Sequence, residues 1–327
     1  MISSIQYLAE AVKRDLFTAL PRQRKTQRDK LALLVATMLH AKTANTMELA
    51  AELPLATERV DMRYQWVSRF LSNPHVNVAE VIEPFGRFIL YNLVQKKQKI
   101  VLIIDQTQAS HDLNVLMISI RWTERALPLL WCVKKTGGNI GFEEQKKLLD
   151  CIALWIPCGA SIVLMGDRFY GAAELISYCK AKGWDYRLRL KGNLVVRQGT
   201  KEYKTKDLEK LKIPFLERVS ITGHYQQTNL AVIHEEGHAE PWIIAMNQKP
   251  DFYTCLDYEM RWAIEPMFSD FKSRGFGLED TQLRYPDRLE RLILVMAIGM
   301  IWAVLIGMWE AFYHPLPYER SIVSKKL

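Results

Sequence analysis

The feature that most constrains the fold is a succession of short apolar runs that begins at Ile100. Residues 100–107, IVLIIDQT, form a β-branched run of strand length, and residues 114–122 and 126–135 resemble it. Amphipathic helical patterns follow at residues 142–156 and 169–183, and strand-like runs come after each of them, at residues 161–167 and 184–190. The predicted order is β-β-β-α-β-α-β. A three-stranded meander followed by αβ units predicts a mixed sheet with helices on its faces.

The regions on either side of these runs have other patterns. Residues 1–99 repeat apolar positions at helical spacing and predict an α-helical N-terminal region. Residues 100–190 would be the first part of an α/β core, and the short strand-like runs of residues 191–250 predict a β-rich insertion. Helical patterns return in residues 251–327, the predicted second part of the core, with a continuous helix from Tyr253 to about Arg274 and a long apolar helix after Pro286.

The long apolar segment could be either a membrane-spanning helix or a buried core helix. Leu292 to Trp309 is an uncharged run at the threshold length for crossing a bilayer. The run is isolated, and Arg288 and Arg291 precede it on the same helical pattern, so we interpret it as a buried helix and expect no membrane contact. The first residues lack the order of a signal peptide, and the five cysteines form no CxxC pair. We therefore expect a cytoplasmic protein with reduced thiols.

The net charge of +8, from 44 basic and 36 acidic residues, suggests a polyanionic partner such as nucleic acid. The charge is unevenly distributed along the chain. Residues 1–99 carry a net +6 and residues 180–218 a net +7, whereas residues 100–179 and 219–327 carry −1 and −4. Two basic segments are therefore candidates for DNA contact, and the two remaining segments are candidates for a cation site.

Two acids end apolar strand patterns, Asp105 in IVLIID and Asp167 in SIVLMGD. One such aspartate usually caps a turn, but two in a sheet of this order favour a site in the crevice at the sheet edge. Carboxylate oxygens suit Mg²⁺ and Mn²⁺. Two metals ~4 Å apart would stabilise both oxygens of an in-line phosphoryl displacement. Such a pair needs a third carboxylate, for which Glu265 is the best candidate.

Glu265 lies in a segment with further functional candidates. Tyr258, Arg261 and Glu265 are spaced three and four residues apart, so they share one face of a continuous helix. Lys272 lies seven residues beyond Glu265 and falls on the same face. The acid can bind metal while the cations bind phosphate oxygens beside it. A solvated, salt-bridged helix face has the same spacing, and the pattern alone leaves both interpretations open.

These residues together resemble a known family. Tyr258-x2-Arg261-x3-Glu265-x6-Lys272 fits the Y-R-E-K signature of DDE transposases of the insertion-sequence-four type, and Asp105 in IIDQT and Asp167 in GDRFYG resemble their first two acids. The resemblance covers residues 100–310. It implies an RNase H-like core, interrupted by a β-rich insertion and preceded by helices that contact the element ends.

The resemblance also implies chemistry and partners. Asp105, Asp167 and Glu265 would coordinate two Mg²⁺ ions, for which Mn²⁺ may substitute, and Tyr258, Arg261 and Lys272 would position end phosphates. The enzyme would be an endonuclease that cleaves double-stranded DNA at terminal inverted repeats and joins the free 3′-OH to target DNA. A homodimer would hold two ends, in association with the bacterial nucleoid. An RNase H-like nuclease without strand transfer and a DNA-end-binding remnant that no longer cuts are the alternatives.

Further residues are candidates for DNA contact. The basic ones lie beside Asp167, along one strand and near an N-terminal helix start: Arg168; Arg187, Arg189 and Lys191; Arg22, Arg24, Lys25 and Arg28. The resemblance implies that Trp242, an aromatic of the insertion, could stack a flipped base, although a buried strand tryptophan fits its context better. His234 and His238 satisfy the H-E-x-x-H zinc-protease pattern, which requires a helix. Gly237 and the flanking strand-like runs favour a hairpin turn instead.

Overall fold

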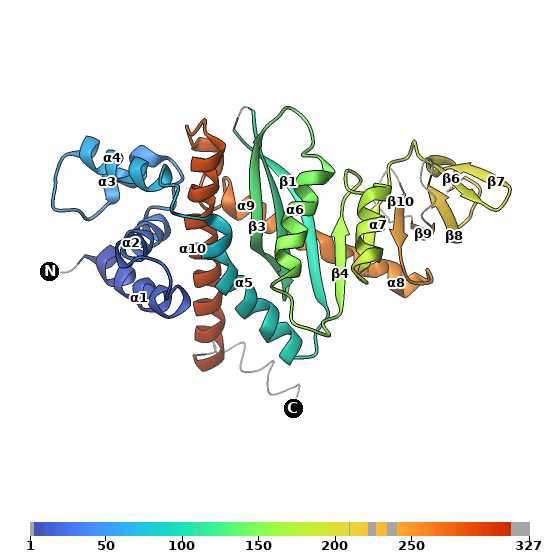
Figure 1. Ribbon diagram of the computed structural model, residues 1–327, viewed down its shortest axis with the longest axis horizontal. Coiled ribbons are helices and arrows are strands. Elements are labelled where there is room, and N and C mark those ends of the chain that lie inside the picture. The colour runs from blue at the N-terminus through green and yellow to red at the C-terminus, as the bar shows by residue number, and fades with distance from the viewer. Residues whose placement is uncertain (1–2, 111, 209, 222–226, 234–240, 315–327) are drawn as a thin grey trace. The chain divides into compact units, whose positions relative to one another are not determined.

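The computed structural model in Figure 1 describes residues 3–110, 112–208, 210–221, 227–233 and 241–314. The chain divides into two compact units. One unit consists of Met1–Val81 and Ser273–Leu327, and the other of Ile82–Lys272. The division into four functional regions at residues 1–99, 100–190, 191–250 and 251–327 stays a prediction.

The first unit is helical in its described residues, as the apolar spacing predicted. Its helices are α1 (Ser4–Ala19), α2 (Lys25–Ala41), α3 (Thr46–Glu52), α4 (Val60–Leu71), the 3₁₀ turn η3 (Leu278–Asp280) and α10 (Pro286–Tyr313). A capping box starts α1, because Ser3 accepts from the backbone N–H of Gln6 and the Gln6 side chain accepts from the N–H of Ser3. The long helix α5 (Val78–Gln95) begins at the end of this unit and continues into the second.

The apolar helix α10 is a core helix along its N-terminal half. It packs against α2 and α4, and its residues from Leu292 to Ile298 are buried without interruption. Within the described ranges it is the one helix long and apolar enough to cross a membrane, and 56% of its most apolar window is buried. A buried helix that is apolar all round passes the same test, so no membrane is indicated.

The second unit is built on one ten-stranded mixed sheet (Figure 1). The strands run in the order β3-β2-β1-β4-β5-β10-β9-β8-β6-β7. Their bounds are β1 (Ile100–Ser110), β2 (Leu113–Trp122), β3 (Arg125–Lys135), β4 (Ile162–Gly166), β5 (Asp185–Arg189), β6 (Val195–Gln198), β7 (Lys201–Lys204), β8 (Phe215–Ile221), β9 (Gln227–Ile233) and β10 (Trp242–Met246). Pairs β1–β4 and β4–β5 are parallel and the other pairs antiparallel. The predicted α/β class, the mixed sheet and the β-β-β-α-β-α-β order of elements along the chain are confirmed.

Helices pack on the sheet between β3 and β5. Helices α6 (Phe142–Ala153) and α9 (Ile264–Phe271) both contact β3, and α7 (Ala173–Ala181) contacts β5. Strand β4 is buried along its whole length, which explains why IVLMG is continuously apolar rather than alternating. This architecture is consistent with an RNase H-like core.

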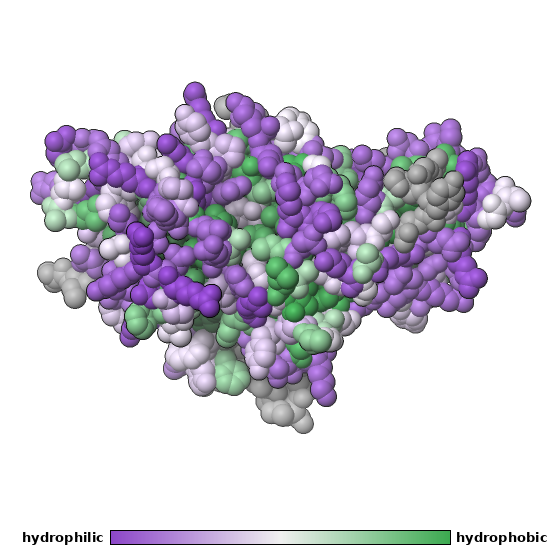
Figure 2. Space-filling view, viewed as in Figure 1, coloured by the Kyte–Doolittle hydropathy of each residue, from purple (hydrophilic) through white to green (hydrophobic). Residues whose placement is uncertain are grey.

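The β-rich insertion extends the same sheet. Strand β10 pairs antiparallel with β5, with Met246 opposite Arg187, and β9, β8, β6 and β7 follow outward. Strand β7, with the sequence KEYK, was missed because it lacks an apolar face for the alternation rule to detect. Hydrophilic residues dominate the visible surface of these outer strands in Figure 2, in keeping with their many lysines and arginines.

The predicted continuous helix from Tyr253 to Arg274 is wrong. The segment consists of α8 (Phe252–Leu256), a 3₁₀ helix η2 (Asp257–Ala263) and α9, which ends at Phe271. Pro266 lies in the first turn of α9, the part of an α-helix that tolerates a residue without an N–H. A new α-helix therefore begins just before the proline.

Candidate active site

Asp105 and Asp167 lie side by side because the parallel pairing of β1 with β4 stops just before them. Strand β1 itself continues to Ser110, so the expectation that Asp105 ends its strand is wrong. Ile104 of β1 pairs with Gly166 of β4, and each aspartate is the next residue along its strand direction. The Asp105 carboxylate accepts from the N–H of Gln106 at 2.8 Å, and that of Asp167 from the N–H of Phe169 at 2.9 Å. Local backbone groups therefore orient both acids where the pairing of β1 with β4 stops.

Arg261 connects Asp105 to the third acid. Its Nη1 lies 3.3 Å from Asp105 Oδ2 and its Nη2 lies 2.7 Å from Glu265 Oε1. The Arg261 side chain is 11% exposed and that of Glu265 is 60% exposed. The structure thus brings Asp105, Asp167 and Glu265 into one region, with a guanidinium between the first and the third.

The electrostatics of Asp105 are unfavourable for a free carboxylate. Burial raises the pKa of Asp105 to about 6, and the nearby charges of Asp167 and Glu265 act in the same direction. The Gln106 N–H and Arg261 only partly oppose this rise. Burial, together with the charges of Asp105 and Asp167, also raises the pKa of the Tyr170 phenol beside them. The site therefore has excess negative charge that a bound cation would relieve.

The donor chemistry fits a hard divalent cation, although the present arrangement is not a finished metal site. Three carboxylates supply the oxygen ligands that Mg²⁺ prefers. Across the described ranges, however, no group of three or more His, Cys, Asp or Glu side chains is arranged to hold a metal ion. Arg261 occupies the space between Asp105 and Glu265, so it must move before both can bind one ion.

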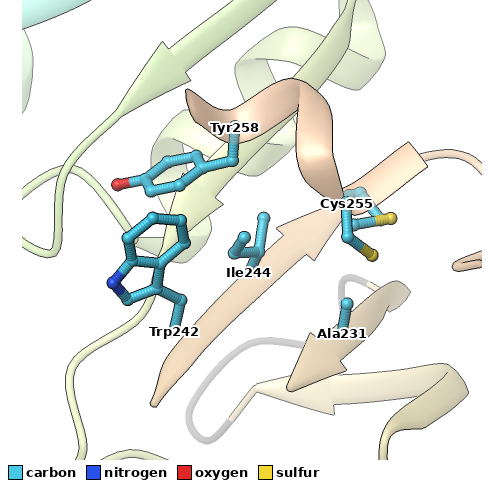
Figure 3. Packing of buried hydrophobic residues seen from close by; sticks show 6 residues of the cluster. Ala231, Trp242, Ile244, Cys255 and Tyr258 are labelled. Atoms are coloured by element: carbon cyan, nitrogen blue, oxygen red, sulfur yellow. The ribbon is translucent and has the colours of Figure 1, made fainter. Parts of the chain in front are cut away.

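Tyr258 has a supporting role that differs from the predicted phosphate contact. It is 2% exposed, and its hydroxyl donates to the carbonyl of Gly166 at 3.3 Å. Its ring packs edge-on against Trp242, with centroids 5.4 Å apart (Figure 3). Tyr258 therefore attaches η2 to the end of β4, next to Asp167, and its phenol is not accessible to DNA in this conformation.

Trp242 belongs to a buried cluster with Ala231, Ile244, Met246, Cys255 and Tyr258 (Figure 3). It is 4% exposed and also packs edge-on against Trp262. The expectation that Trp242 stacks a flipped base is corrected, because its ring faces are covered by the core. The competing interpretation, a buried strand tryptophan, holds.

The predicted basic stripe on β5 divides into two parts. Arg187 is 0% exposed and hydrogen-bonds inside the protein, so its prediction as a DNA contact is wrong. Arg189 and Lys191 instead line a pocket of about 510 Å³, which Arg168 joins from the turn after Asp167. Strand alternation could not show that Arg187 is covered while Arg189 lines a pocket, and it does not apply to Lys191, which lies beyond the last residue of β5.

The pocket contains two cations that the sequence interpretation missed. Lys206 and Lys210 complete a lining that includes five basic side chains, Phe169 and no described acid. Lys191 Nζ lies 5.4 Å from the centre of the Phe169 ring and Arg168 Cζ lies 5.9 Å from it. The net +7 of residues 180–218 was the available signal for these lysines, but their positions depend on the fold.

Two further predictions concern Lys272 and the N-terminal basic cluster. Lys272 follows the last residue of α9 in a non-helical conformation, so it is not on a helical stripe with Glu265.

In the N-terminal basic cluster, Arg28 donates to the carbonyls of Phe17 and Leu20 at the end of α1, which is a structural role. The neighbouring Arg22, Arg24 and Lys25 are exposed, and their contact with DNA stays a prediction. The motif with His234 and His238 lies outside the described residues.

Two carboxylates where the pairing of neighbouring parallel strands stops, joined by a third from a helix, form the kind of cluster that metal-dependent phosphoryl-transfer enzymes use. Residues 142–302 match the family described as transposase DDE domain. This match supports a DDE transposase, a class that acts on DNA. The matched range contains Asp167 and Glu265. Asp105 precedes this range, and its assignment to the site depends on its position beside Asp167. A search of curated proteins gave no match.

Proposed function

We propose that the protein is the transposase of an insertion sequence of the insertion-sequence-four type, which cleaves DNA at element ends and joins them to target DNA. The observation that carries the proposal is the meeting of Asp105, Asp167 and the Arg261–Glu265 pair where the pairing of β1 with β4 stops. The Y-R-E-K spacing and the transposase DDE domain match support the same class.

Asp105, Asp167 and Glu265 would hold two Mg²⁺ ions, or Mn²⁺ in their place. When bound, the ions activate the attacking water or 3′-OH and neutralise charge on the leaving oxygen. The protein supplies the position of the acids and leaves the Asp105 side chain only 18% exposed. Arg261 would exchange its carboxylate partners for a phosphate oxygen of the DNA, since guanidinium groups bind both in the same geometry.

The basic pocket supports contact with the DNA backbone next to the acids. Its cations come from the turn after Asp167, from the end of β5 and from the insertion, so one backbone segment could contact all three. Cations gathered without an acid among them repel one another, and phosphate groups would relieve that repulsion. Arg168, Arg189, Lys191, Lys206 and Lys210 are therefore the proposed contacts, with the exposed N-terminal Arg22, Arg24 and Lys25. A homodimer would hold two ends.

The pocket proposal predicts a change in the salt dependence of DNA binding. The double variant Lys206→Gln/Lys210→Gln should bind end DNA more weakly and reduce the slope of log K against log salt by roughly 2, because two phosphate contacts are lost. Fluorescence anisotropy of a labelled duplex over a salt series measures this slope. The double variant Lys201→Gln/Lys204→Gln removes the same charge from β7, outside the pocket lining. Equal slopes in both double variants would contradict the pocket assignment.

The proposed reaction predicts joined products. Purified full-length protein is incubated with Mg²⁺, a fragment that carries the DNA flanking its gene, and a supercoiled target plasmid. We expect cleavage at terminal inverted repeats, a free 3′-OH and fragment joined to plasmid on gels. Cleavage without joining would indicate the nuclease instead, and binding without cleavage the remnant. Either result would overturn the transposase proposal.

A further inference from the structure

Arg187 is the largest fully buried side chain in the described structure and carries a charge that the catalytic proposal does not use. It lies on β5, between Met165 of β4 and Met246 of β10 in the sheet register. Its side chain is 0% exposed. A buried guanidinium costs several kcal/mol unless partners satisfy it, so its contacts indicate what the charge is for.

All three guanidinium nitrogens have partners, and most of these come from one segment. Nε donates to the carbonyl of Thr254 at 3.0 Å, and Nη2 donates to Gln248 Oε1 at 2.9 Å and lies 3.8 Å from Asp257 Oδ2. Nη1 donates to the carbonyl of Tyr186 at 2.9 Å. Gln248 is itself held by a hydrogen bond from its Nε2 to Asp185 Oδ2 at 3.0 Å. Arg187 therefore joins β5 to the end of α8 and the first residue of η2.

The segment that Arg187 holds is the one that carries the third acid. Asp257 starts η2, which contains Tyr258 and Arg261 and continues directly into α9 with Glu265. Tyr258 makes the second attachment, to the carbonyl of Gly166 beside Asp167. The helical segment is thus fastened to β5 at its start and to β4 one residue later. These two attachments hold the start of the segment, and α9 further along it packs against β3 and β1.

We propose that Arg187 is a positioning residue, which holds the Asp257–Phe271 segment on the sheet so that Glu265 faces Asp105 and Asp167. Arg187 touches neither DNA nor metal in this role. The fixed, planar arrangement of its five donors suits it to hold several carbonyl and carboxylate groups at once, which a lysine cannot reproduce. The catalytic consequence rests on the proposed transposase function, whereas the attachment itself does not.

The test compares full-length Arg187→Met and Arg187→Lys with the unsubstituted protein by hydrogen exchange and by cleavage. Deuterium uptake should rise at least about tenfold in rate in residues 252–271 and stay unchanged in β1 and β4. In the cleavage assay, kcat should fall about 10- to 100-fold while the KM and Kd for end DNA stay within about twofold, since a displacement near 1 Å has an effect of this size. Arg197→Met on β6, an exposed arginine paired with Glu202, is the matched control.

The other outcomes are equally decisive. Uniformly faster exchange, or unchanged exchange in residues 252–271, would show ordinary core packing and overturn the proposal. If either variant fails to fold, Asp257→Asn keeps the Arg187 hydrogen bonds and removes only the ion pair, and it should shift exchange and kcat in the same direction but less. If the unsubstituted protein does not cleave DNA, the transposase proposal fails, and the exchange result alone decides the role of Arg187.

Discussion

Asp105→Asn is expected to abolish cleavage and at the same time to stabilise the folded protein. Cleavage should fall roughly 10³-fold or more, equivalent to about 4 kcal/mol, because an amide cannot replace a carboxylate that binds the catalytic cations. Asp167→Asn and Glu265→Gln should lose cleavage to a similar degree and keep their affinity for end DNA. Initial rates with Mg²⁺, together with anisotropy for binding, measure the two effects separately.

The stabilisation follows from the sign of the pKa shift. The pKa of Asp105 is raised from 3.8 to about 6, so the folded state binds its proton more tightly than the unfolded state. The ionised carboxylate therefore lowers stability above pH 6, and this penalty develops as the pH rises from about 4 to 6. Asp105→Asn removes it and should raise the free energy of unfolding at pH 8 by about 1 to 3 kcal/mol. The advantage should shrink below pH 6 and vanish near pH 3.

Asp150→Asn is the matched control with the opposite sign. Hydrogen bonds from Lys146 and Lys182, assisted by one from Tyr178, lower the pKa of Asp150 well below its usual range. This substitution should leave cleavage unchanged and reduce stability at pH 8. Denaturant unfolding without metal at pH 8, 5 and 3 gives the comparison. Cleavage by Asp105→Asn, or a loss of stability at pH 8, would contradict the role assigned to Asp105.

Gly171→Ala is expected to destabilise the second unit by about 3 kcal/mol or more. A Cβ at Gly171 would lie 2.1 Å from the carbonyl oxygen of Arg189 and 3.0 Å from Leu190 Cα, and both are backbone atoms that cannot rotate away. The turn from Asp167 to Gly171 must then move away from β5. That movement shifts Asp167 and Phe169, so cleavage and DNA binding should weaken together.

The control for Gly171 is Gly137→Ala, where an added Cβ meets no atom within 4 Å and the backbone is not left-handed. Its unfolding free energy should stay within about 0.5 kcal/mol of the unsubstituted protein. The two variants are compared by denaturant unfolding and by circular dichroism at the assay temperature. Equal stability of both variants would show that the close approach of Gly171 to β5 is not required.

The core strands and the two aspartates were predictable because their signals are local. An apolar β-branched run that leads to an aspartate, as at Asp105 and Asp167, indicates a buried strand with an acid after its apolar part. The end of the strand was placed correctly at Asp167 but not at Asp105, because β1 continues to Ser110. The parallel pairing of Ile104 with Gly166 then brings the two acids together. The 3₁₀ helix η2 was not predicted, although Pro266 was a local signal against one continuous helix.

Local patterns were sufficient for the α/β class, the order of the core elements along the chain, the β-rich character of the insertion and the candidate acids. All of these follow from periodicity and from residues close in the chain. Contacts between distant segments decided the rest. Residues 248, 254 and 257 bury Arg187, and Lys206 and Lys210 meet Arg168 in one pocket only because the insertion continues the sheet beyond β5. A charged side chain is stable in the interior only where such partners are assembled, and the identity of one residue cannot reveal that.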